Sequence, residues 1–374
     1  MIFSHDLAIP QSLYIHYPLC RHHCSYCDFN VRSVSQIASK EDFDQNWLDS
    51  LKRHLSNWRS GGSLKTLYFG GGTPSLISER VLASLIEELQ LFFKWDDQIE
   101  VSLEANPEDI TEEKLKFLKE LGINRLSLGV QSFSGQELRR LERLATLENL
   151  EDHLSLVAKH FQNFSFDLMF GIPEQSRESL ELSLDRIFSF SPPHVSIYLL
   201  TIAEDHKWRR SQKMNSLLAN EDQCVAMYEW ICERMQREGY RHYEVSNFAK
   251  EGFESRHNKN YWNPEKSYLA LGPGAHGYCC GAEKIRYENC HSLSEWMKSE
   301  TGIQGIEILN AEQQKLEEAY LRLRTRMPLS EEGLDPKAVK NFIEAGLVEK
   351  YAQDIRVSER SWILLDGIAS KLLS

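Results

Sequence analysis

The sequence lacks any apolar run that approaches the roughly 20 residues needed to cross a bilayer. Its first residues, M-I-F-S-H-D, also lack the basic segment and apolar stretch of a signal peptide. Positive charge is scarce: 43 lysines and arginines stand against 55 acidic residues, for a net charge of -12. Such an acidic chain is not expected to bind nucleic acid through its phosphates. We therefore expect a cytoplasmic protein with at most a loose peripheral attachment to a membrane.

Cysteine is too sparse for a disulfide scaffold, with eight in 374 residues. Three of the eight, Cys20, Cys24 and Cys27, stand together in the pattern C-x3-C-x2-C, and the next cysteine is Cys224. Three thiolates on one short loop can ligate three irons of a cubane cluster and leave the fourth iron open to a small molecule. The alternatives are a zinc site, completed by His22 or His23, and a redox-active thiol group.

Strand-like segments alternate with helical ones along most of the chain. Strands are predicted over Ser12–His16, Leu64–Phe69, Ile99–Leu103, Arg125–Val130, Phe164–Phe170 and Val195–Leu200, and helices over Asp42–Trp58, Glu79–Phe93, Gly135–Leu144, Leu147–Lys159 and Asp222–Arg237. This alternation predicts an α/β fold in which a parallel sheet forms a barrel or partial barrel. In such barrels the chemistry lies at the C-terminal ends of the strands.

Glycines and polar residues follow the predicted strands where that chemistry is expected. The run Gly70–Pro74 follows the second strand and lacks the Lys-Ser/Thr of a nucleotide-binding loop. Glycine lets backbone amides approach an anionic group, although a tight strand–helix turn also needs glycine. Glu104 follows the third strand, where it could accept from an amino group or a ribose hydroxyl, or form an ordinary ion pair.

Gln131 and Asp167 stand in the apolar runs L-S-L-G-V-Q and F-S-F-D-L-M-F. Burying either side chain without a partner is costly. Each is therefore hydrogen-bonded within the fold or faces a ligand. We favour the ligand, because both lie on the side of the predicted barrel where the chemistry is expected.

Several segments together resemble the radical SAM superfamily, and within it the branch of the oxygen-independent coproporphyrinogen III oxidase (HemN) and the HemW-type heme chaperones. They span Tyr14 to Gly277 and read Y-I-H-Y-P-L-C-R-H-H-C-S-Y-C-D-F, F-G-G-G-T-P-S, L-E-A-N-P, R-L-S-L-G-V-Q-S-F, D-L-M-F-G-I-P, Y-E-V-S-N-F-A, R-H-N-K-N-Y-W and L-G-P-G-A-H-G. The resemblance covers nearly the whole chain. It implies a partial (β/α)6 TIM-type barrel of the radical SAM kind.

The resemblance also implies cofactors and the residues that hold them. Cys20, Cys24 and Cys27 would ligate a [4Fe-4S] cluster whose open iron binds S-adenosylmethionine (SAM). The residues expected beside SAM, on the same resemblance, are Tyr14, Tyr26, Gly71, Gly72, Thr73, Glu104, Gln131, Arg143 and Asp167.

Two places in the sequence favour the chaperone side of this branch. The oxidase carries a further cysteine two residues after the third ligand, where this chain has Phe29. The string H-N-x-x-Y-W, with His257, Tyr261 and Trp262, is similar to the heme-associated motif of the chaperones. Neutral imidazole is a good axial ligand for heme iron. The alternative is that His257 is a hydrogen-bonded loop histidine and that the two aromatic residues belong to the core.

The expected function is therefore that of a heme chaperone that binds heme and passes it to acceptor hemoproteins. The competing expectation is oxidative decarboxylation of coproporphyrinogen III, an activity that we expect this scaffold to lack. The domains are predicted as a partial barrel over 1–250, a connecting segment with the H-N-x-x-Y-W motif over 251–300 and a small, mostly helical domain over 301–374. Within the last, helices are expected over Ala311–Arg324 and Pro336–Ala345, and a hairpin over Arg356–Leu365.

Overall fold

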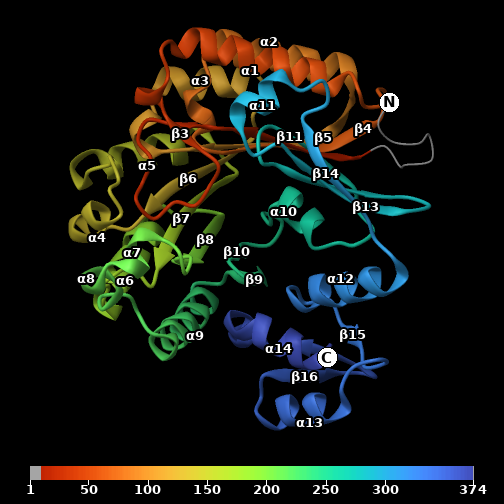
Figure 1. The fold of residues 1–374 in the computed structure, drawn as a ribbon. Coiled ribbons are helices and arrows are strands. Elements are labelled where there is room, and N and C mark those ends of the chain that lie inside the picture. Colours follow the sequence, from red (N-terminus) through yellow and green to blue (C-terminus); the bar gives the residue numbers. More distant parts are fainter. Residues whose placement is uncertain (1–9, 374) are drawn as a thin grey trace. The chain divides into compact units, whose positions relative to one another are not determined.

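The computed structural model describes residues 10–373, and they form two compact units (Figure 1). Unit 1 contains the described residues up to Val130, then Leu138–Ser165 and Glu265–Leu309. Unit 2 contains Gln131–Glu137, Phe166–Pro264 and the described residues from Asn310 onward. The two units are groups of residues that pack densely among themselves, whereas the predicted boundaries near residues 250 and 300 were placed by sequence motifs. The units therefore do not test those boundaries, which stay a prediction.

Parallel strands form the centre of the sheet in unit 1. The strands lie in the order β14 (Ile303–Ile308), β13 (Lys284–Asn289), β12 (His276–Cys280), β11 (Tyr268–Leu271), β1 (Ser12–Tyr17), β4 (Ser63–Gly71), β5 (Lys94–Ala105) and β6 (Arg125–Gln131). The pairs from β11 through β1, β4 and β5 to β6 are parallel, and β11, β12, β13 and β14 pair antiparallel with one another. The antiparallel extension was not predicted from the sequence.

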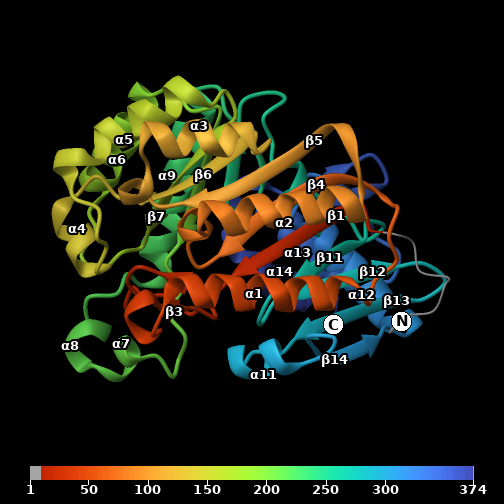
Figure 2. The ribbon, with the colours of Figure 1, turned by 90° about the horizontal axis from the view of Figure 1, so that it is seen from above.

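Helices cover the parallel strands because each carries an apolar stripe. The helices of unit 1 are α1 (Lys40–Leu55), α2 (Glu79–Phe92), α3 (Glu112–Glu120), α5 (Leu147–His160) and α11 (Leu293–Lys298). The apolar residues that recur at helical spacing in α1 are buried, namely Phe43, Trp47, Leu48, Leu51 and Leu55. Figure 2 shows α1 and α2 side by side over the strands of unit 1.

Unit 2 continues from β7 (Phe164–Phe170), the strand in which the chain passes from one unit to the other. Its strands are β7, β8 (His194–Leu199), β10 (Asn247–Ala249) and β9 (Arg241–Glu244), in that order. Its helices up to residue 264 are α6 (Arg177–Ser189), α7 (Lys207–Arg210), α8 (Gln212–Asn215), α9 (Glu221–Arg237) and α10 (Arg256–Tyr261).

The C-terminal part of unit 2 combines helices with a small sheet. The helices are α12 (Ala311–Leu323), α13 (Pro336–Glu344) and α14 (Leu365–Leu372), and the antiparallel sheet has the order β15 (Leu329–Ser330), β17 (Asp354–Val357), β16 (Val348–Tyr351). The hairpin predicted over Arg356–Leu365 is wrong. The hairpin is β16–β17, turned by Ala352 at φ 55°, and Glu359–Leu364 is a 3-10 helix.

The predicted helix over Gly135–Leu144 is shorter in the structure, because α4 (Gly135–Arg140) stops at Arg140. Glu142 adopts the left-handed conformation with φ 55°, and the Arg143 amide donates to the Leu138 carbonyl at 2.9 Å. This is the geometry of a helix C-terminus closed by a left-handed residue. The turn releases Arg143 from the helix.

None of the helices formed by residues 10–373 combines the length and the apolar character that a bilayer crossing demands.

One buried histidine makes the stability of unit 1 depend on pH. The His54 Nε2 atom lies 2.9 Å from the Ser299 carbonyl oxygen, and the ring contacts Trp296 with centroids 4.7 Å apart. Its Nδ1 atom has no hydrogen-bond partner among the described residues. Burial lowers the pKa of His54 to about 4. Between pH 6.5 and 4, His54 is therefore protonated in the unfolded chain and neutral in the folded chain. The free energy of unfolding falls as the pH falls through this range.

We expect His54→Gln to reduce this pH sensitivity. Between pH 7 and pH 5 the wild-type chain should lose about 2 kcal/mol more unfolding free energy than the variant, because the variant has no imidazole to protonate. Urea unfolding of the cluster-free chain at the two pH values measures the difference, with His153→Gln as the control. An equal loss in His54→Gln and wild type would contradict the assignment.

Candidate functional site

The three clustered cysteines lie on a loop that a short parallel pair closes at its base. β2 (Leu19–Cys20) pairs with β3 (Arg32–Ser33), so that Cys20 lies opposite Ser33. The 3-10 helix Val34–Gln36 follows β3. Inside the loop, the Cys27 amide donates to the Cys24 carbonyl at 3.1 Å and forms a tight turn. The pairing holds Cys20 at the base of the loop and the turn brings Cys24 and Cys27 together.

Side chains from other segments of unit 1 anchor the loop. Arg21 Nε lies 2.5 Å from Asp109 Oδ1, in the 3-10 helix Pro107–Asp109 that follows β5. On the other side of the cysteines, Asn30 Nδ2 donates to the His291 carbonyl at 2.8 Å. The Asn30 carbonyl oxygen lies 3.0 Å from His16 Nε2 in β1. The loop is therefore held on both sides of the three thiols.

The thiols form a set that a metal cluster can use. Cys20, Cys24 and Cys27 are free cysteines of intermediate exposure. Burial raises the pKa of Cys20 to about 11 and raises the pKa of Cys24 and Cys27 as well. The thiols therefore keep their protons at neutral pH until a metal displaces them.

The number of thiols on the loop bears on the choice between zinc and a cluster. A structural zinc ion usually takes four protein ligands, so with three thiols it would need His22 or His23 as the fourth. Three thiolates match a cubane, in which each binds a different iron.

The parallel register of β1, β4 and β5 brings further predicted residues to the same edge of the sheet. His16 lies opposite Gly70, and Phe69 lies opposite Leu103. Glu104 accepts from the Tyr68 hydroxyl at 2.8 Å and from the Gly71 amide at 3.1 Å. Both of its carboxylate oxygens therefore connect β5 to the end of β4.

The glycines at the end of β4 are required by packing within unit 1. Gly71 has φ 106°, and a Cβ there would come within 2.5 Å of the His16 ring. A Cβ on Gly72 would come within 2.5 Å of the Leu19 carbonyl oxygen. This is the tight-turn explanation that the sequence left open, and it accounts for both glycines without a ligand. Contact of Gly71 and Gly72 with SAM stays a prediction.

His16 was missed from the sequence, although it stands in the Y-I-H-Y string. Its Nδ1 atom lies 3.1 Å from the Tyr14 hydroxyl, and its Nε2 atom faces the cysteine loop through Asn30. Burial lowers the pKa of His16 to about 4, so the ring is neutral. The imidazole links β1, the glycine turn and the cysteine loop.

The Arg143 side chain reaches the cysteine loop from the turn after α4. Its Nη1 atom lies 3.9 Å from Cys24 Sγ, and its Nη2 atom donates to Asn106 Oδ1 at 2.6 Å and to the Gly129 carbonyl at 2.7 Å. Asn106 in turn donates to Thr73 Oγ1 at 3.2 Å, in the turn that precedes the 3-10 helix Pro74–Leu76. Asn106 was not predicted as a site residue, but the L-E-A-N-P string contains it.

Tyr26 lies on the cysteine loop, and burial raises the pKa of its hydroxyl. The structure thus brings most of the predicted residues together in unit 1, namely Cys20, Cys24, Cys27, Tyr14, Tyr26, Gly71, Gly72, Thr73, Glu104 and Arg143. Gln131, with φ 68°, and Asp167 belong to unit 2, so their contact with SAM stays a prediction.

The H-N-x-x-Y-W residues lie in unit 2 on and after α10. His257 is fully buried, and its Nε2 atom lies 2.8 Å from the Tyr261 hydroxyl. The Arg324 guanidinium lies over the Trp262 ring, 5.1 Å from its centroid. The motif is therefore engaged with protein groups, and heme binding by these residues stays a prediction.

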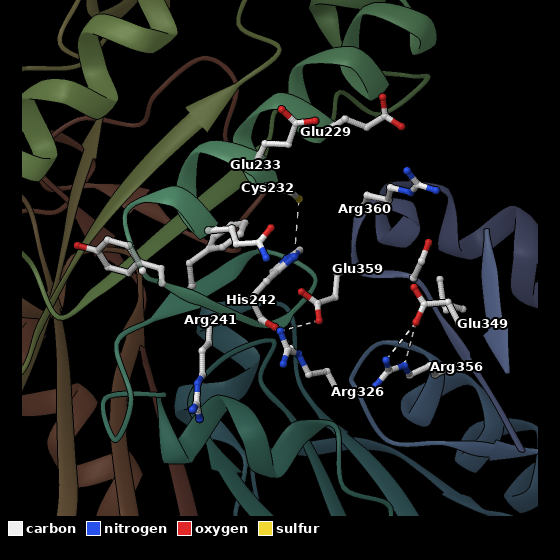
Figure 3. A pocket seen from close by; sticks show the side chains of 16 residues that line it. Glu229, Cys232, Glu233, Arg241, His242, Arg326, Glu349, Arg356, Glu359 and Arg360 are labelled. Atoms are coloured by element: carbon white, nitrogen blue, oxygen red, sulfur yellow. Dashed lines mark hydrogen bonds and ion pairs between the residues drawn. The ribbon is translucent and has the colours of Figure 1, made fainter. Parts of the chain in front are cut away.

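Unit 2 also contains a cavity of about 640 Å³, which α9, β9, Glu349 and residues 356–360 line in part (Figure 3). Much of its charge is paired: Arg326 lies 2.5 Å from Glu359, and Arg356 lies 3.1 Å from Glu349. The sequence predicted no site residue among those that line it. We assign it no role in the predicted chemistry.

A cysteine and a histidine meet in the same cavity (Figure 3). Cys232 Sγ lies 3.7 Å from His242 Nδ1. Burial raises the pKa of Cys232 to about 12 and lowers the pKa of His242 to about 3. Both groups are therefore neutral at physiological pH, which is the opposite of the thiolate–imidazolium pair of a cysteine nucleophile.

Comparison with known proteins gives matches over nearly the whole chain. A family model described as Radical SAM superfamily matches residues 14–187. The heme chaperone HemW of Lactococcus lactis is 33% identical over 387 residues, with 98% of both chains covered. The heme chaperone HemW of Bacillus subtilis is 33% identical over 372 residues, with 95% of this chain and 97% of that chain covered.

Among solved structures, the coproporphyrinogen III oxidase HemN from Escherichia coli, described as a radical SAM enzyme, matches with a TM-score of 0.82. The match covers 96% of this chain and 89% of that chain, at 20% sequence identity. It confirms the predicted fold class, α/β with a partial barrel of the radical SAM kind. At this identity the likeness concerns the fold alone.

We expect replacement of Cys20, Cys24 or Cys27 by serine to abolish cluster binding, because two thiolates cannot hold a cubane that needs three protein ligands. Iron and sulfide analysis of anaerobically reconstituted protein measures the loss. Cys224→Ser, a half-exposed cysteine of α9, is the control and should keep full iron and sulfide. Cluster retention in all three loop variants, or zinc without sulfide in the wild type, would contradict the cluster.

Arg143→Lys should weaken the cluster site while leaving the fold intact. A lysine carries one point charge and cannot contact Asn106, the Gly129 carbonyl and the Cys24 sulfur together. We expect cluster loss to a chelator to accelerate by about tenfold, the usual cost of removing a supporting contact at a metal site. Visible absorbance follows the loss, and Arg139→Lys on the exposed side of α4 is the control. Equal rates in both variants and wild type would remove Arg143 from the site.

Proposed function

We propose a function from one premise: this chain belongs to the radical SAM superfamily and, within it, to the HemW family. The function is that of a heme chaperone that binds heme and transfers it to acceptor hemoproteins in the cytoplasm. The observation that carries the proposal is the match to a heme chaperone HemW over 98% of both chains. A match over only part of the chain would support the same fold but not the same function.

The cofactors follow from the family and from the donor set of the loop. Cys20, Cys24 and Cys27 would hold a [4Fe-4S] cluster, whose chemistry is electron transfer to a SAM molecule bound at the open iron. Arg143, which lies among these thiols, would offset part of the negative charge of the thiolates and cluster. Glu104, fixed by Tyr68 and Gly71, would present its carboxylate to the polar part of SAM.

Heme would bind at the H-N-x-x-Y-W segment. A neutral imidazole is the ligand that this segment offers to iron. His257 Nε2 would exchange its 2.8 Å contact with the Tyr261 hydroxyl for a bond to iron. Trp262 would exchange the Arg324 guanidinium for the macrocycle, which leaves Arg324 available to pair with a propionate.

The second candidate function is oxygen-independent oxidation of coproporphyrinogen III. The fold is common to both functions, because the solved oxidase matches with a TM-score of 0.82. Phe29 argues against the oxidase, since it stands where the oxidase carries a further cysteine and is 67% exposed. We therefore propose that the scaffold lacks this activity.

Titration of the cluster-loaded protein with heme tests the chaperone proposal. Wild type should give a Soret band of a ligated heme, and His257→Ala should shift or lose it with at least about tenfold weaker binding. Tyr261→Phe frees Nε2 without removing the imidazole, so it should keep the band. His153→Ala is the control for loss of a histidine elsewhere.

Equal heme binding by wild type and His257→Ala would remove His257 as a ligand. No heme binding by the wild type would overturn the chaperone proposal itself. Anaerobic incubation with SAM, a reductant and coproporphyrinogen III tests the competing function. Protoporphyrinogen formation would establish the oxidase and contradict a chaperone without that activity.

A further inference from the structure

Two histidines and a glutamate gather on the surface of unit 1, away from any residue used so far as a ligand. His276 in β12 lies opposite Glu288 in β13, and His291 follows in the turn after β13. One donor atom from each side chain lies within 4.8 Å of the other two. Directly opposed residues of an antiparallel pair project to the same face of the sheet, so the strand register itself sets the His276–Glu288 pair.

The distances lie close to those that one metal ion requires. His291 Nε2 lies 3.9 Å from Glu288 Oε2, and the His276 and His291 ring centroids lie 6.1 Å apart. An ion about 2.1 Å from each donor needs donors about 3.4 Å apart, which modest side-chain rotations supply. His276 and His291 are exposed and Glu288 is half-buried, so solvent can reach the remaining coordination positions.

A neighbouring glutamine holds two of the three residues in place. Gln304 in β14 donates from Nε2 to Glu288 Oε1 at 3.1 Å and accepts from the His291 amide at 3.1 Å. Glu288 Oε1 is therefore engaged, while Oε2 faces His291. A partner that orients a ligating carboxylate in this way is the usual support of a metal site.

A glycine leaves room for the carboxylate. Gly305 lies opposite Glu288 in β14, and a Cβ there would come within 2.8 Å of Glu288 Oε1. Any larger residue at position 305 would push the carboxylate away from its present place. The missing side chain at Gly305 therefore leaves the space that the Glu288 carboxylate occupies.

We propose that His276, Glu288 and His291 bind a divalent transition-metal ion of the zinc class. Two imidazoles and one carboxylate suit Zn²⁺, Co²⁺, Ni²⁺ and Fe²⁺ and do not suit the oxygen-preferring Ca²⁺ and Mg²⁺. The site is separate from the three cysteines and does not depend on the heme proposal.

Bound metal would stiffen the support of the cysteine loop. The His291 carbonyl accepts from Asn30, three residues after Cys27. Gly274, two residues before His276, lies so close to Asn30 that a Cβ would come within 2.7 Å of its Nδ2 atom. An ion that ties His291 to β12 and β13 therefore restrains the segments on which Asn30 rests.

Zinc titration of the cluster-loaded protein by calorimetry under anaerobic conditions tests the proposal. The cluster occupies the cysteines, and iron and sulfide content checks that it stays in place. Wild type should bind one equivalent of Zn²⁺ at this site. His276→Ala, His291→Ala and Glu288→Gln should each weaken it by about tenfold or more, and Gly305→Ala by a similar factor through the displaced carboxylate.

His160→Ala is the matched control, since His160 also lies near a carboxylate, 3.3 Å from Glu112, but lacks a second imidazole. Co²⁺ gives a second readout: ligand-field bands without thiolate-to-cobalt charge transfer support this site. The proposal is overturned if wild type binds no zinc, or if the three ligand variants bind it as tightly as wild type. It is also overturned if the cobalt spectrum shows thiolate ligands and is unchanged by His276→Ala.

Discussion

The parallel pairing of β1 with β4 and of β4 with β5 is the constraint on which the candidate site depends. It places Tyr14 opposite Tyr68 and His16 opposite Gly70. Because these strands run in one direction, the loop after β1, the glycine turn after β4 and the end of β5 reach the same edge of the sheet. The His16 ring then fills the space that Gly71 leaves, so the turn and the cysteine loop rest on one side chain.

Arginine side chains lie at this edge of the sheet, although the chain as a whole is acidic. The net charge is -12, yet Arg143 is directed at Cys24, and Arg21 is paired with Asp109 beside the loop. Burial keeps the free thiols protonated, so a cluster must displace protons as it binds. Arg143 would compensate part of the negative charge of the bound thiolates and cluster.

The residues of the H-N-x-x-Y-W motif in unit 2 already contact other protein groups. His257 is fully buried and in contact with Tyr261, and Arg324 lies over Trp262. His257 and Tyr261 satisfy one another through their hydrogen bond, as buried polar groups must, whereas Arg324 contacts Trp262 only at the face of its ring. Heme binding would have to exchange these contacts for better ones, which makes uptake and release a balance between two sets of partners. A balance of this kind would suit the proposed heme chaperone, which has to release its ligand to an acceptor.

The sequence by itself determined the main strands and helices from β1 to α9 and the cysteine loop, but not the strands β11–β14 or the β16–β17 hairpin. Periodicity predicted a helix over most of α1 and the strand β7 with its bounds as observed, because burial of an apolar stripe follows local spacing. The three cysteines were recognisable because their ligand geometry is local to one loop. Only the tertiary structure decided the roles of His16 and Asn106, the contact of Arg143 with Cys24 and the His276–Glu288–His291 group. Those arrangements depend on strand register and on a left-handed residue at Glu142, which join positions far apart in sequence and leave no periodic signal.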